Sequence, residues 1–233
     1  MVTCIIFCGG RGMRLKELTE NTPKPLIKIG SYSIVEHIMD QYIEHFDDIN
    51  FILLTGYKHE SFVKEFDDRP GVTVFNTGLD TKTGHRLAMA LEELDTEISD
   101  TFFLTYGDGL SDINLNDLLK FHDAYKHRLF TLTAVPFKSK YGLIVESEGG
   151  HYSFDEKPRI PNRYVNGGYM VTTKEIINYI PVKDTMLVEN TIPTLFELGK
   201  VNVFHLKNDN YWKCIDTYKD YEEMVQLYED DKL

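Results

Sequence analysis

Residues 2–15 read VTCIIFCGGRGMRL, and this stretch decides the fold class of the chain. Residues 2–8 form a nearly continuous apolar run that stops at Gly9-Gly10, which is typical of a strand buried on both faces of a sheet. Similar runs recur at 51–55, 72–75, 101–106 and 130–135, and apolar patterns of helical period lie at 34–46 and 87–94. Because strands alternate with helices, we predict an α/β fold with a doubly wound, mostly parallel, Rossmann-like central sheet.

The sequence changes in character after Pro136. Further strands are expected at 142–146, 152–154, 164–171 and 201–206, the first two as a hairpin around Gly149-Gly150, and helices at 173–179, 188–198 and 217–228. No Pro/Gly/Ser-rich linker, internal repeat or low-complexity stretch separates the halves. We therefore predict one domain, 1–233, with a first lobe at 1–136 and a mixed second lobe at 137–233.

The charge balance restricts the partners. The chain carries 37 Asp and Glu against 25 Lys and Arg, a formal net charge of −12, which disfavours nucleic acid and anionic membrane surfaces. No apolar segment is long enough to span a bilayer, and the first residues lack the basic region of a secretory signal. The three cysteines show no zinc-ligand spacing and are interpreted as small buried side chains. A cytoplasmic protein is expected.

The glycines after the first run indicate a phosphate site. Gly9, Gly10 and Gly12 at the carboxyl end of a parallel strand would let backbone N–H groups approach phosphate oxygens, although a tight turn is the simpler alternative. The stretch lacks the Gly-Lys-Ser/Thr of a Walker loop and the third glycine of a dinucleotide fingerprint. Arg14 and Lys24 would add two cations beside the amides, which suits a triphosphate.

This pattern resembles the signature of the sugar-phosphate nucleotidyltransferases, or nucleotide-sugar pyrophosphorylases. The similarity rests on Gly9-Gly10-x-Gly12-x-Arg14-Leu15, Pro23-Lys24-Pro25, Tyr106-Gly107-Asp108-Gly109, Phe154-x-Glu156-Lys157-Pro158, Val165-Asn166-Gly167-Gly168-Tyr169 and Trp212-x-x-x-Asp216-Thr217, in family order. It implies a fold of the nucleotide-diphospho-sugar transferase type and the reaction of an NTP with a sugar 1-phosphate to give an NDP-sugar and pyrophosphate. Lobe 1–136 would bind the nucleotide and lobe 137–233 the sugar phosphate.

Within the family the chain is most similar to the cytidylyltransferases that act on glucose 1-phosphate, through 77–78, 83–87 and 105–109. This similarity implies CTP as the nucleotide and pyrimidine recognition by Gly84 and Arg86. Threonine capping of the helix that follows is the alternative for this stretch. The family likeness also implies assembly into a homo-oligomer.

Two aspartates are the candidate metal ligands. Asp108 follows a buried strand and would emerge at the ligand-bearing edge of the sheet, and Asp216 follows an apolar stretch. The alternatives are a turn former at Asp108 and a helix cap at Asp216. By resemblance both hold Mg²⁺, which prefers a few carboxylates together with phosphate oxygens and water.

The resemblance implies a sugar-phosphate site formed by Glu156, Lys157, Asn166, Gly167 and Glu189. It also implies that Arg14, Lys24 and Lys157 are the catalytic cations. The alternatives are a surface ion pair at Glu156-Lys157, a bulge at Asn166-Gly167 and a favourable helix-dipole position for Glu189. The attacking phosphate oxygen is already mostly ionised at neutral pH, so positioning and charge neutralisation are expected to suffice without a general base.

The sequence departs from the family pattern at four places. Met13 and His85 replace a threonine and a glycine, the connection 75–84 is short, and 186–188 lacks the expected tryptophans. Two alternatives therefore stay open. One is a uridylyl- or thymidylyltransferase of the same family, and the other is a catalytically silent regulatory or binding subunit. The joint presence of Arg14, Lys24, Asp108, Lys157 and Asp216 argues against the silent subunit.

Overall fold

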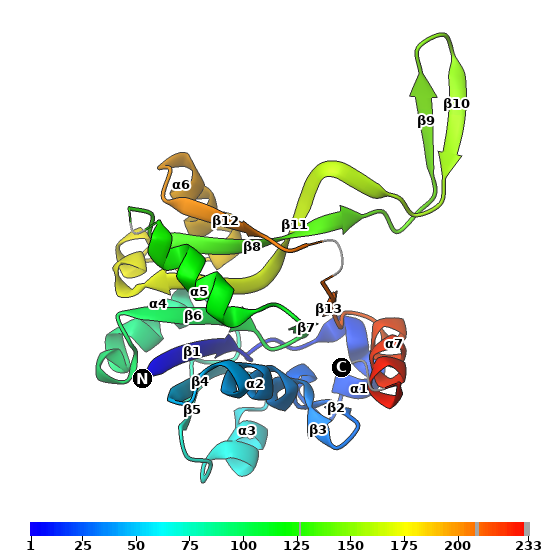
Figure 1. Cartoon of the computed structure of the whole chain (residues 1–233). Helices are drawn as coiled ribbons and strands as arrows, with labels where there is room; N and C mark the ends of the chain where they lie inside the picture. Colours follow the sequence, from blue (N-terminus) through cyan, green and yellow to red (C-terminus); the bar gives the residue numbers. More distant parts are fainter. Residues whose placement is uncertain (126, 208–209, 231–233) are drawn as a thin grey trace.

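A computed structural model describes residues 1–125, 127–207 and 210–230 as an α/β/α sandwich around a seven-stranded sheet (Figure 1). The strands are β1 (Val2–Phe7), β4 (Ile49–Thr55), β5 (Val72–Asn76), β6 (Thr101–Tyr106), β8 (Phe130–Lys138), β11 (Arg159–Thr173) and β12 (Val201–His205), in the spatial order β12-β8-β11-β6-β1-β4-β5. β11 runs antiparallel to both of its neighbours, and the other pairings in this sheet are parallel. The predicted doubly wound, mostly parallel sheet is therefore confirmed.

Strand β1 lies inside the sheet, between β6 and β4, as its apolar sequence predicts. Cys4 pairs with Phe51 of β4 on one side and with Phe103 of β6 on the other. Alternate residues of β1 then face opposite cores: Ile6 belongs to one buried cluster and Ile5 to the other. A strand enclosed on both faces needs apolar residues at every position, which is the pattern at the start of the chain.

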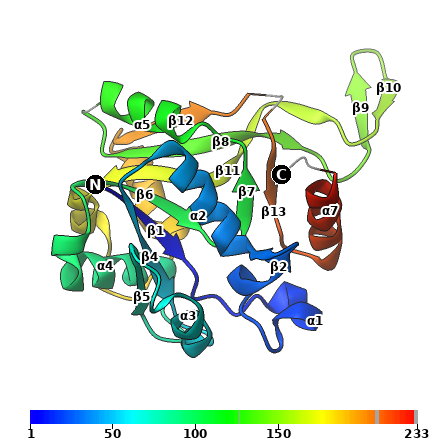
Figure 2. The same ribbon diagram turned by 60° about the horizontal axis from the view of Figure 1, so that its bottom comes forward.

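The helices cover the two faces of the sheet (Figures 1 and 2). Helices α2 (Ile34–His45), α3 (His59–Phe66), α5 (Leu115–Ala124) and α7 (Tyr218–Glu229) contribute buried side chains to one cluster, whereas α4 (Thr83–Glu93) and α6 (Ile192–Glu197) contribute to the other. A capping box at Ser33 and Glu36 starts α2, and a second one at Thr217 and Asp220 starts α7. The α1 helix (Lys16–Thr19) is a single turn after the glycine loop.

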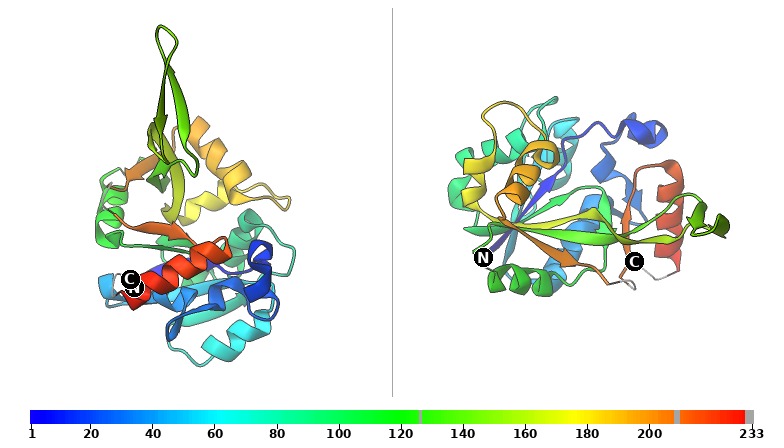
Figure 3. Two further views of the ribbon diagram at one scale, coloured as in Figure 1. Left: turned by 90° about the vertical axis from the view of Figure 1, so that its right-hand side faces the viewer. Right: turned by 90° about the horizontal axis from the view of Figure 1, so that it is seen from above.

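A hairpin arm projects from the body (Figure 3). It consists of β9 (Leu143–Ser147) and β10 (His151–Asp155), which pair antiparallel as the sequence predicts. Two further small sheets pair β2 (Lys28–Ile29) with β3 (Tyr32–Ser33) and β7 (Gly109–Ser111) with β13 (Trp212–Cys214). The β7–β13 pair joins segments about a hundred residues apart, at the edge where β6 ends.

Several elements differ from the prediction. The helix expected at 173–179 is the 3₁₀ helix Lys174–Tyr179, and the one expected at 188–198 begins as a π-helical turn, Leu187–Thr191, before α6. Helices α3 and α5 were not predicted, and neither were β7 and β13. Short 3₁₀ helices also lie at Met13–Leu15, Lys24–Leu26 and Asp95–Glu97. Within the described residues, no helix is long and apolar enough to cross a membrane.

Candidate active site

A cavity of about 560 Å³ lies where β1, β5 and β6 end, a size within the range of small-molecule sites. These parallel strands finish at the same edge of the sheet, so the loops that follow them meet there. The lining comes from the glycine loop, the segment after β5, the turn after β6, and residues around Lys24, Met186 and Asp216. Of the predicted nucleotide-site residues, Gly9, Gly10, Gly12, Arg14, Lys24, Arg86 and Asp108 line it.

Two aspartates and two cations form one cluster at this cavity. Nζ of Lys24 lies 2.7 Å from Oδ2 of Asp108 and 3.0 Å from Oδ1 of Asp216. Arg14 donates a 2.9 Å hydrogen bond to Oδ2 of Asp216. The sequence prediction that these four residues share a site is consistent with this geometry, although they lie up to 202 positions apart in the chain.

Local structure explains how each member reaches the cluster. Lys24 opens a 3₁₀ helix between Pro23 and Pro25, and all three residues are buried. Asp108 follows β6, and its carbonyl accepts a 2.9 Å hydrogen bond from the N–H of Ile215. This bond continues the β7–β13 pairing and brings Asp216 beside Asp108.

The electrostatics of the cluster favour charged side chains. Burial alone would lower the pKa of Lys24, but the carboxylates of Asp108 and Asp216 outweigh that effect and hold the pKa above its usual value. Nearby, burial and the charge of Asp108 raise the pKa of Tyr106 to about 12, so this phenol stays protonated at neutral pH. The positive charge of the Lys24 ammonium is therefore balanced by the Asp108 and Asp216 carboxylates, which lie next to it in a partly buried position.

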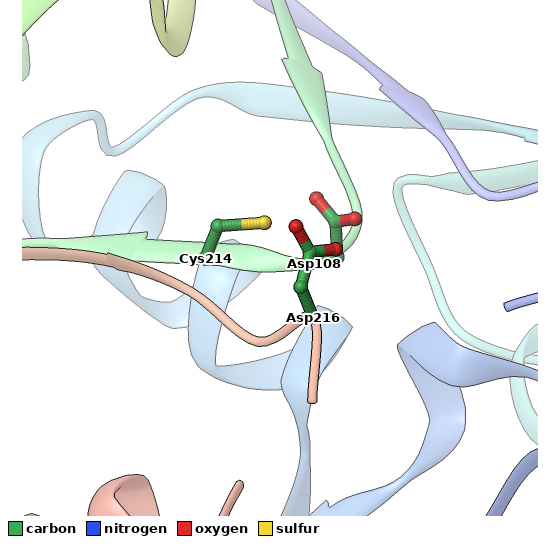
Figure 4. Close-up of side chains that lie close together, drawn as sticks. All are labelled: Asp108, Cys214 and Asp216. Atoms are coloured by element: carbon green, nitrogen blue, oxygen red, sulfur yellow. The ribbon is translucent and has the colours of Figure 1, made fainter. Parts of the chain in front are cut away.

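The donors also fit a divalent cation. Oxygen atoms of Asp108 and Asp216 and the sulfur atom of Cys214 lie within 4.8 Å of one another (Figure 4). Carboxylates are the ligands that Mg²⁺ prefers, whereas a thiol is not among them. Burial raises the pKa of the Cys214 thiol to about 12, so it is neutral at physiological pH. If a divalent cation binds here, the two aspartates would be its ligands and Cys214 a neighbour.

Arg86 lines the cavity and is held there by several hydrogen bonds to the chain itself. It is 4% exposed, and its guanidinium donates to the carbonyls of Thr55 at 2.8 Å and Gly9 at 3.3 Å and to the hydroxyl of Thr77. Burial lowers its pKa. An arginine so engaged fixes the ends of β1, β4 and β5 to one another and shapes this cavity. A contact between Arg86 and a base stays a prediction.

Gly84 lies outside the described lining of the cavity. Its N–H donates a 2.9 Å hydrogen bond to the carbonyl of Thr185, and a Cβ at this position would lie 2.7 Å from the same oxygen. The glycine is therefore required for close packing between the start of α4 and the segment before Leu187. The predicted base contact at Gly84 is not supported by this arrangement.

A second cavity, of about 200 Å³, lies on the other side of Asp108 and Asp216. Asn166 and Gly167, two of the residues predicted to bind the sugar phosphate, line this cavity. Nε1 of Trp212 donates a 2.7 Å hydrogen bond to the carbonyl of Gly167, which ties β13 to β11. Because both cavities share the aspartates, a ligand in each would meet at the cluster.

The remaining predicted residues lie elsewhere. Glu156 and Lys157 form an exposed pair, 3.6 Å apart, at the base of the hairpin arm, directly after β10. Lys157 has a φ of 49°, a left-handed conformation that is unusual for a lysine. Glu189 is exposed on the π-helical turn. None of the three is among the described residues that line the two cavities.

Sequence reasoning missed some lining residues. Arg11 pairs with Asp80 at 2.9 Å, which joins the glycine loop to the segment after β5. Leu79, Thr81 and Met186 line the same cavity. These residues could have been found from the position of 79–83, which follow a parallel strand, because the loops after such strands converge at one edge of the sheet.

A doubly wound sheet with a glycine-rich loop and a cavity at the carboxyl ends of its strands defines the class of α/β proteins that bind ligands at this edge. The profile of the nucleotidyl transferase family matches residues 3–231, and the chain belongs to this family. The resemblance inferred from its motifs is thereby confirmed, and the protein is a nucleotidyltransferase.

Relatives and solved structures agree with this assignment. The chain is 33% identical to a probable glucose-1-phosphate cytidylyltransferase of Bacillus subtilis (strain 168), over 96% of this chain and 95% of the relative. It is 30% identical to the glucose-1-phosphate cytidylyltransferase of Salmonella typhimurium, with coverage of 98% and 96%. The structure of HddC from Yersinia pseudotuberculosis with GMP-PN superimposes with a TM-score of 0.68 at 21% identity, covering 98% of this chain and 100% of that one. This last likeness shows the shared fold.

Proposed function

We propose that the protein joins CTP to glucose 1-phosphate and releases pyrophosphate. The observation that supports the reaction most directly is the cluster of Lys24, Asp108 and Asp216 between two cavities, one beside the glycine loop and one beside Asn166. Two substrates bound in these cavities would meet at the cluster. The 560 Å³ cavity takes the nucleotide and is lined mainly by lobe 1–136, whereas the smaller one takes the sugar and is lined by residues of both lobes.

The chemistry follows from bringing two polyanions together. An oxygen of the sugar phosphate attacks the α-phosphorus of the nucleotide, and the bond from that phosphorus to the pyrophosphate oxygen breaks. A phosphate monoester has its second pKa near about 6, so the attacking oxygen is ionised and needs no general base. Catalysis then consists of alignment and charge stabilisation.

The chain's own residues supply most of this environment. Amides of the glycine loop and the side chains of Arg14 and Lys24 would bind the triphosphate. Asp108 and Asp216 would hold a divalent cation, Mg²⁺ in our proposal, which supplies positive charge at the α-phosphate and the leaving pyrophosphate. A few positive charges at the site are enough to bind anionic substrates, although the whole chain has a formal net charge of −12.

The sugar phosphate contacts the second lobe in this proposal. Asn166 and Gly167 line the smaller cavity and would contact the sugar. Lys157 would bind the attacking phosphate, with Glu156 and Glu189 beside the sugar. Lys157 is exposed on the hairpin arm, so this role requires the base of the arm to approach the site when the substrate binds.

The choice of CTP and glucose 1-phosphate rests on the relatives. The two cytidylyltransferases align over at least 95% of their length at 30–33% identity. A probable mannose-1-phosphate guanylyltransferase of Oryza sativa subsp. japonica is 28% identical, and only 64% of its length is covered. The pattern favours a pyrimidine nucleotide.

We also propose that the protein assembles into a homo-oligomer in the cytoplasm. The hairpin arm carries exposed apolar side chains, among them Ile144 at 73%, Tyr152 at 67% and Phe154 at 66% exposure. Apolar residues gathered on a projecting element are typical of a contact surface. Light scattering of the purified protein, before and after Phe154→Asp, tests this point, and a monomeric wild-type protein would contradict it.

A pyrophosphate-release assay tests the reaction. The protein is incubated with Mg²⁺, each of CTP, UTP, dTTP, GTP and ATP, and a panel of sugar 1-phosphates, and the product is identified by mass spectrometry. Release with CTP and glucose 1-phosphate is expected to be the fastest. Faster release with UTP or dTTP would move the assignment to the uridylyl- or thymidylyltransferases, and no release with any pair would favour a silent subunit.

Two variants connect the assay to the site. Asp108→Asn is expected to abolish turnover while leaving the thermal unfolding temperature near that of the wild type. Asp68→Asn, an exposed aspartate between α3 and β5, is the matched control and should keep full activity. Full activity in Asp108→Asn would remove the metal role from this residue.

A further inference from the structure

Lys24 occupies the space between the two aspartates that a metal ion would need. Its ammonium contacts Asp108 at 2.7 Å and Asp216 at 3.0 Å, and its side chain is only 10% exposed. Arg14 takes the other oxygen of Asp216 at 2.9 Å. Three of the four carboxylate oxygens therefore contact a cation that belongs to the chain.

This arrangement makes the free protein a poor metal binder. The two carboxylates and the two cations sum to a formal charge of zero, so the cluster offers no net attraction to a divalent ion. Placing such an ion on the same oxygens while Lys24 remains would bring like charges into contact in a partly buried place. The ion can enter only if the ammonium of Lys24 moves away.

The nucleotide provides the other partner. Lys24 lines the same cavity as the glycine loop, where we place the triphosphate. A lysine has a long flexible stem and a strongly hydrated point charge, so it can exchange one anionic partner for another. A triphosphate in the cavity would compensate the ammonium as it leaves the carboxylates.

We propose that Lys24 is a placeholder cation that exchanges partners, leaving Asp108 and Asp216 to the metal and moving to the nucleotide phosphates, so that metal and nucleotide bind cooperatively. This inference rests on the proposed function, because it needs a nucleotide and a divalent ion at this site. It adds that Lys24 sets the coupling between them. By linkage, each ligand must then raise the affinity for the other by the same factor.

Metal binding measured without turnover tests the coupling. Mn²⁺ affinity is determined by electron paramagnetic resonance, with and without a non-hydrolysable CTP analogue, in the wild type and in Lys24→Gln. In the wild type the analogue is expected to tighten Mn²⁺ binding strongly. In Lys24→Gln, Mn²⁺ should bind the free protein about tenfold more tightly, and the coupling factor should fall by a similar amount, within the range usual for coupled sites.

A matched control separates exchange from general electrostatics. Lys82 lines the same cavity, and among the described residues Asp108 and Asp216 pair with Lys24 and Arg14 and not with Lys82. Lys82→Gln should therefore leave the coupling factor unchanged, whereas Lys24→Arg should retain it. If Lys24→Gln tightens Mn²⁺ binding equally with and without the analogue, the charge acts only at a distance and the exchange is wrong.

A second measurement uses the wild-type protein alone, in case Lys24→Gln fails to fold. The side-chain ammonium resonance of ¹⁵N-labelled Lys24 should move when Mg²⁺ and the analogue are added together. A resonance that stays fixed while both ligands saturate would overturn the exchange. Failure of every nucleotide and of Mn²⁺ to bind at all would instead contradict the proposed function, so the two failures are distinguishable.

Discussion

The indole N–H of Trp212 donates a 2.7 Å hydrogen bond to the carbonyl of Gly167. This bond joins β13, which leads to Asp216, to the irregular part of β11 that carries Asn166. It therefore connects the Asp216 side of the smaller cavity to its Asn166 side, which we propose to be the metal-ligand side and the sugar side. Both residues line that cavity.

We expect Trp212→Phe to loosen this connection. The variant keeps an aromatic ring but removes the only donor of the indole, so the loss in unfolding free energy should be about 1 kcal/mol. The KM for the sugar phosphate should rise more than the KM for the nucleotide. Steady-state kinetics against each substrate test this, with Tyr125→Phe, at the C-terminal cap of α5, as the control. Equal changes in both KM values would contradict a role on the sugar side.

The glycine loop offers a matched pair of substitutions. A Cβ at Gly9 would overlap the guanidinium of Arg86, which is pinned by its bonds to Thr55 and Thr77, whereas a Cβ at Gly10 would meet no described atom within 4 Å. Gly9→Ala should therefore lower the unfolding free energy by about 1–3 kcal/mol, and Gly10→Ala should change it little. Urea unfolding of both variants measures the difference.

The same pair tests the phosphate interpretation. If a triphosphate approaches the loop backbone, the methyl group of Gly10→Ala should weaken nucleotide binding severalfold although the fold is intact. Calorimetric titration with a non-hydrolysable CTP analogue gives the affinity. An unchanged affinity in Gly10→Ala would place the phosphates away from this residue.

Much of this site could be predicted from the sequence, because the sheet brings strand ends together. The apolar strand before Asp108 and the prolines around Lys24 are local signals, and parallel pairing converts them into one cluster. The hydrogen-bond acceptors of the Arg86 guanidinium could not be predicted from the sequence. A basic residue at the start of a helix has the same pattern whether it faces a ligand or buried carbonyls, and only the packing of Thr55 and Gly9 decides between them.

The missed elements have a similar cause. Helix α3 buries only Phe62 and Phe66 in its eight residues, too few to establish a helical period. Strand β13 has three half-buried residues, and its pairing with β7 depends on a contact far away in the chain. The position of Lys157 follows from the direction of the hairpin arm, which no local pattern encodes.

Alkaline pH should destabilise the protein through groups buried in the neutral form. Burial raises the pKa of the Cys4 and Cys8 thiols, and it also raises the pKa of the Tyr42 and Tyr169 phenols. Since the unfolded chain releases these protons first, their contribution is complete below about pH 9 and is lost as the pH rises further. Each thiol would cost about 1.4 kcal/mol per pH unit above its unfolded pKa.

Urea unfolding at about pH 8 and about pH 10.5 measures this loss. The unfolding free energy should fall steeply between the two pH values. Cys4→Ala should make the dependence of this free energy on pH less steep, by the contribution of one proton. A flat profile would show that the thiols ionise equally in the folded and unfolded chain.

Lys157 combines a strained backbone with a proposed catalytic role. Its φ of 49° costs a non-glycine residue roughly 1 kcal/mol, and such strain is retained mainly where function requires the side chain. Lys157→Gly should relieve the strain and leave the unfolding free energy equal to or above that of the wild type. It should nevertheless raise the KM for the sugar phosphate and lower kcat, because the attacking phosphate loses its cation.

Kinetics and urea unfolding of Lys157→Gly and Lys157→Ala separate the two effects. Both variants should lose activity to the same degree, while only the alanine variant keeps the strained backbone. Lys140→Ala, an exposed lysine near the base of the same arm, is the control and should keep the wild-type KM. If Lys157→Gly keeps the wild-type response to sugar phosphate, the hairpin arm does not deliver a cation to the site, and the attacking phosphate must be held by Arg14 and Lys24 alone.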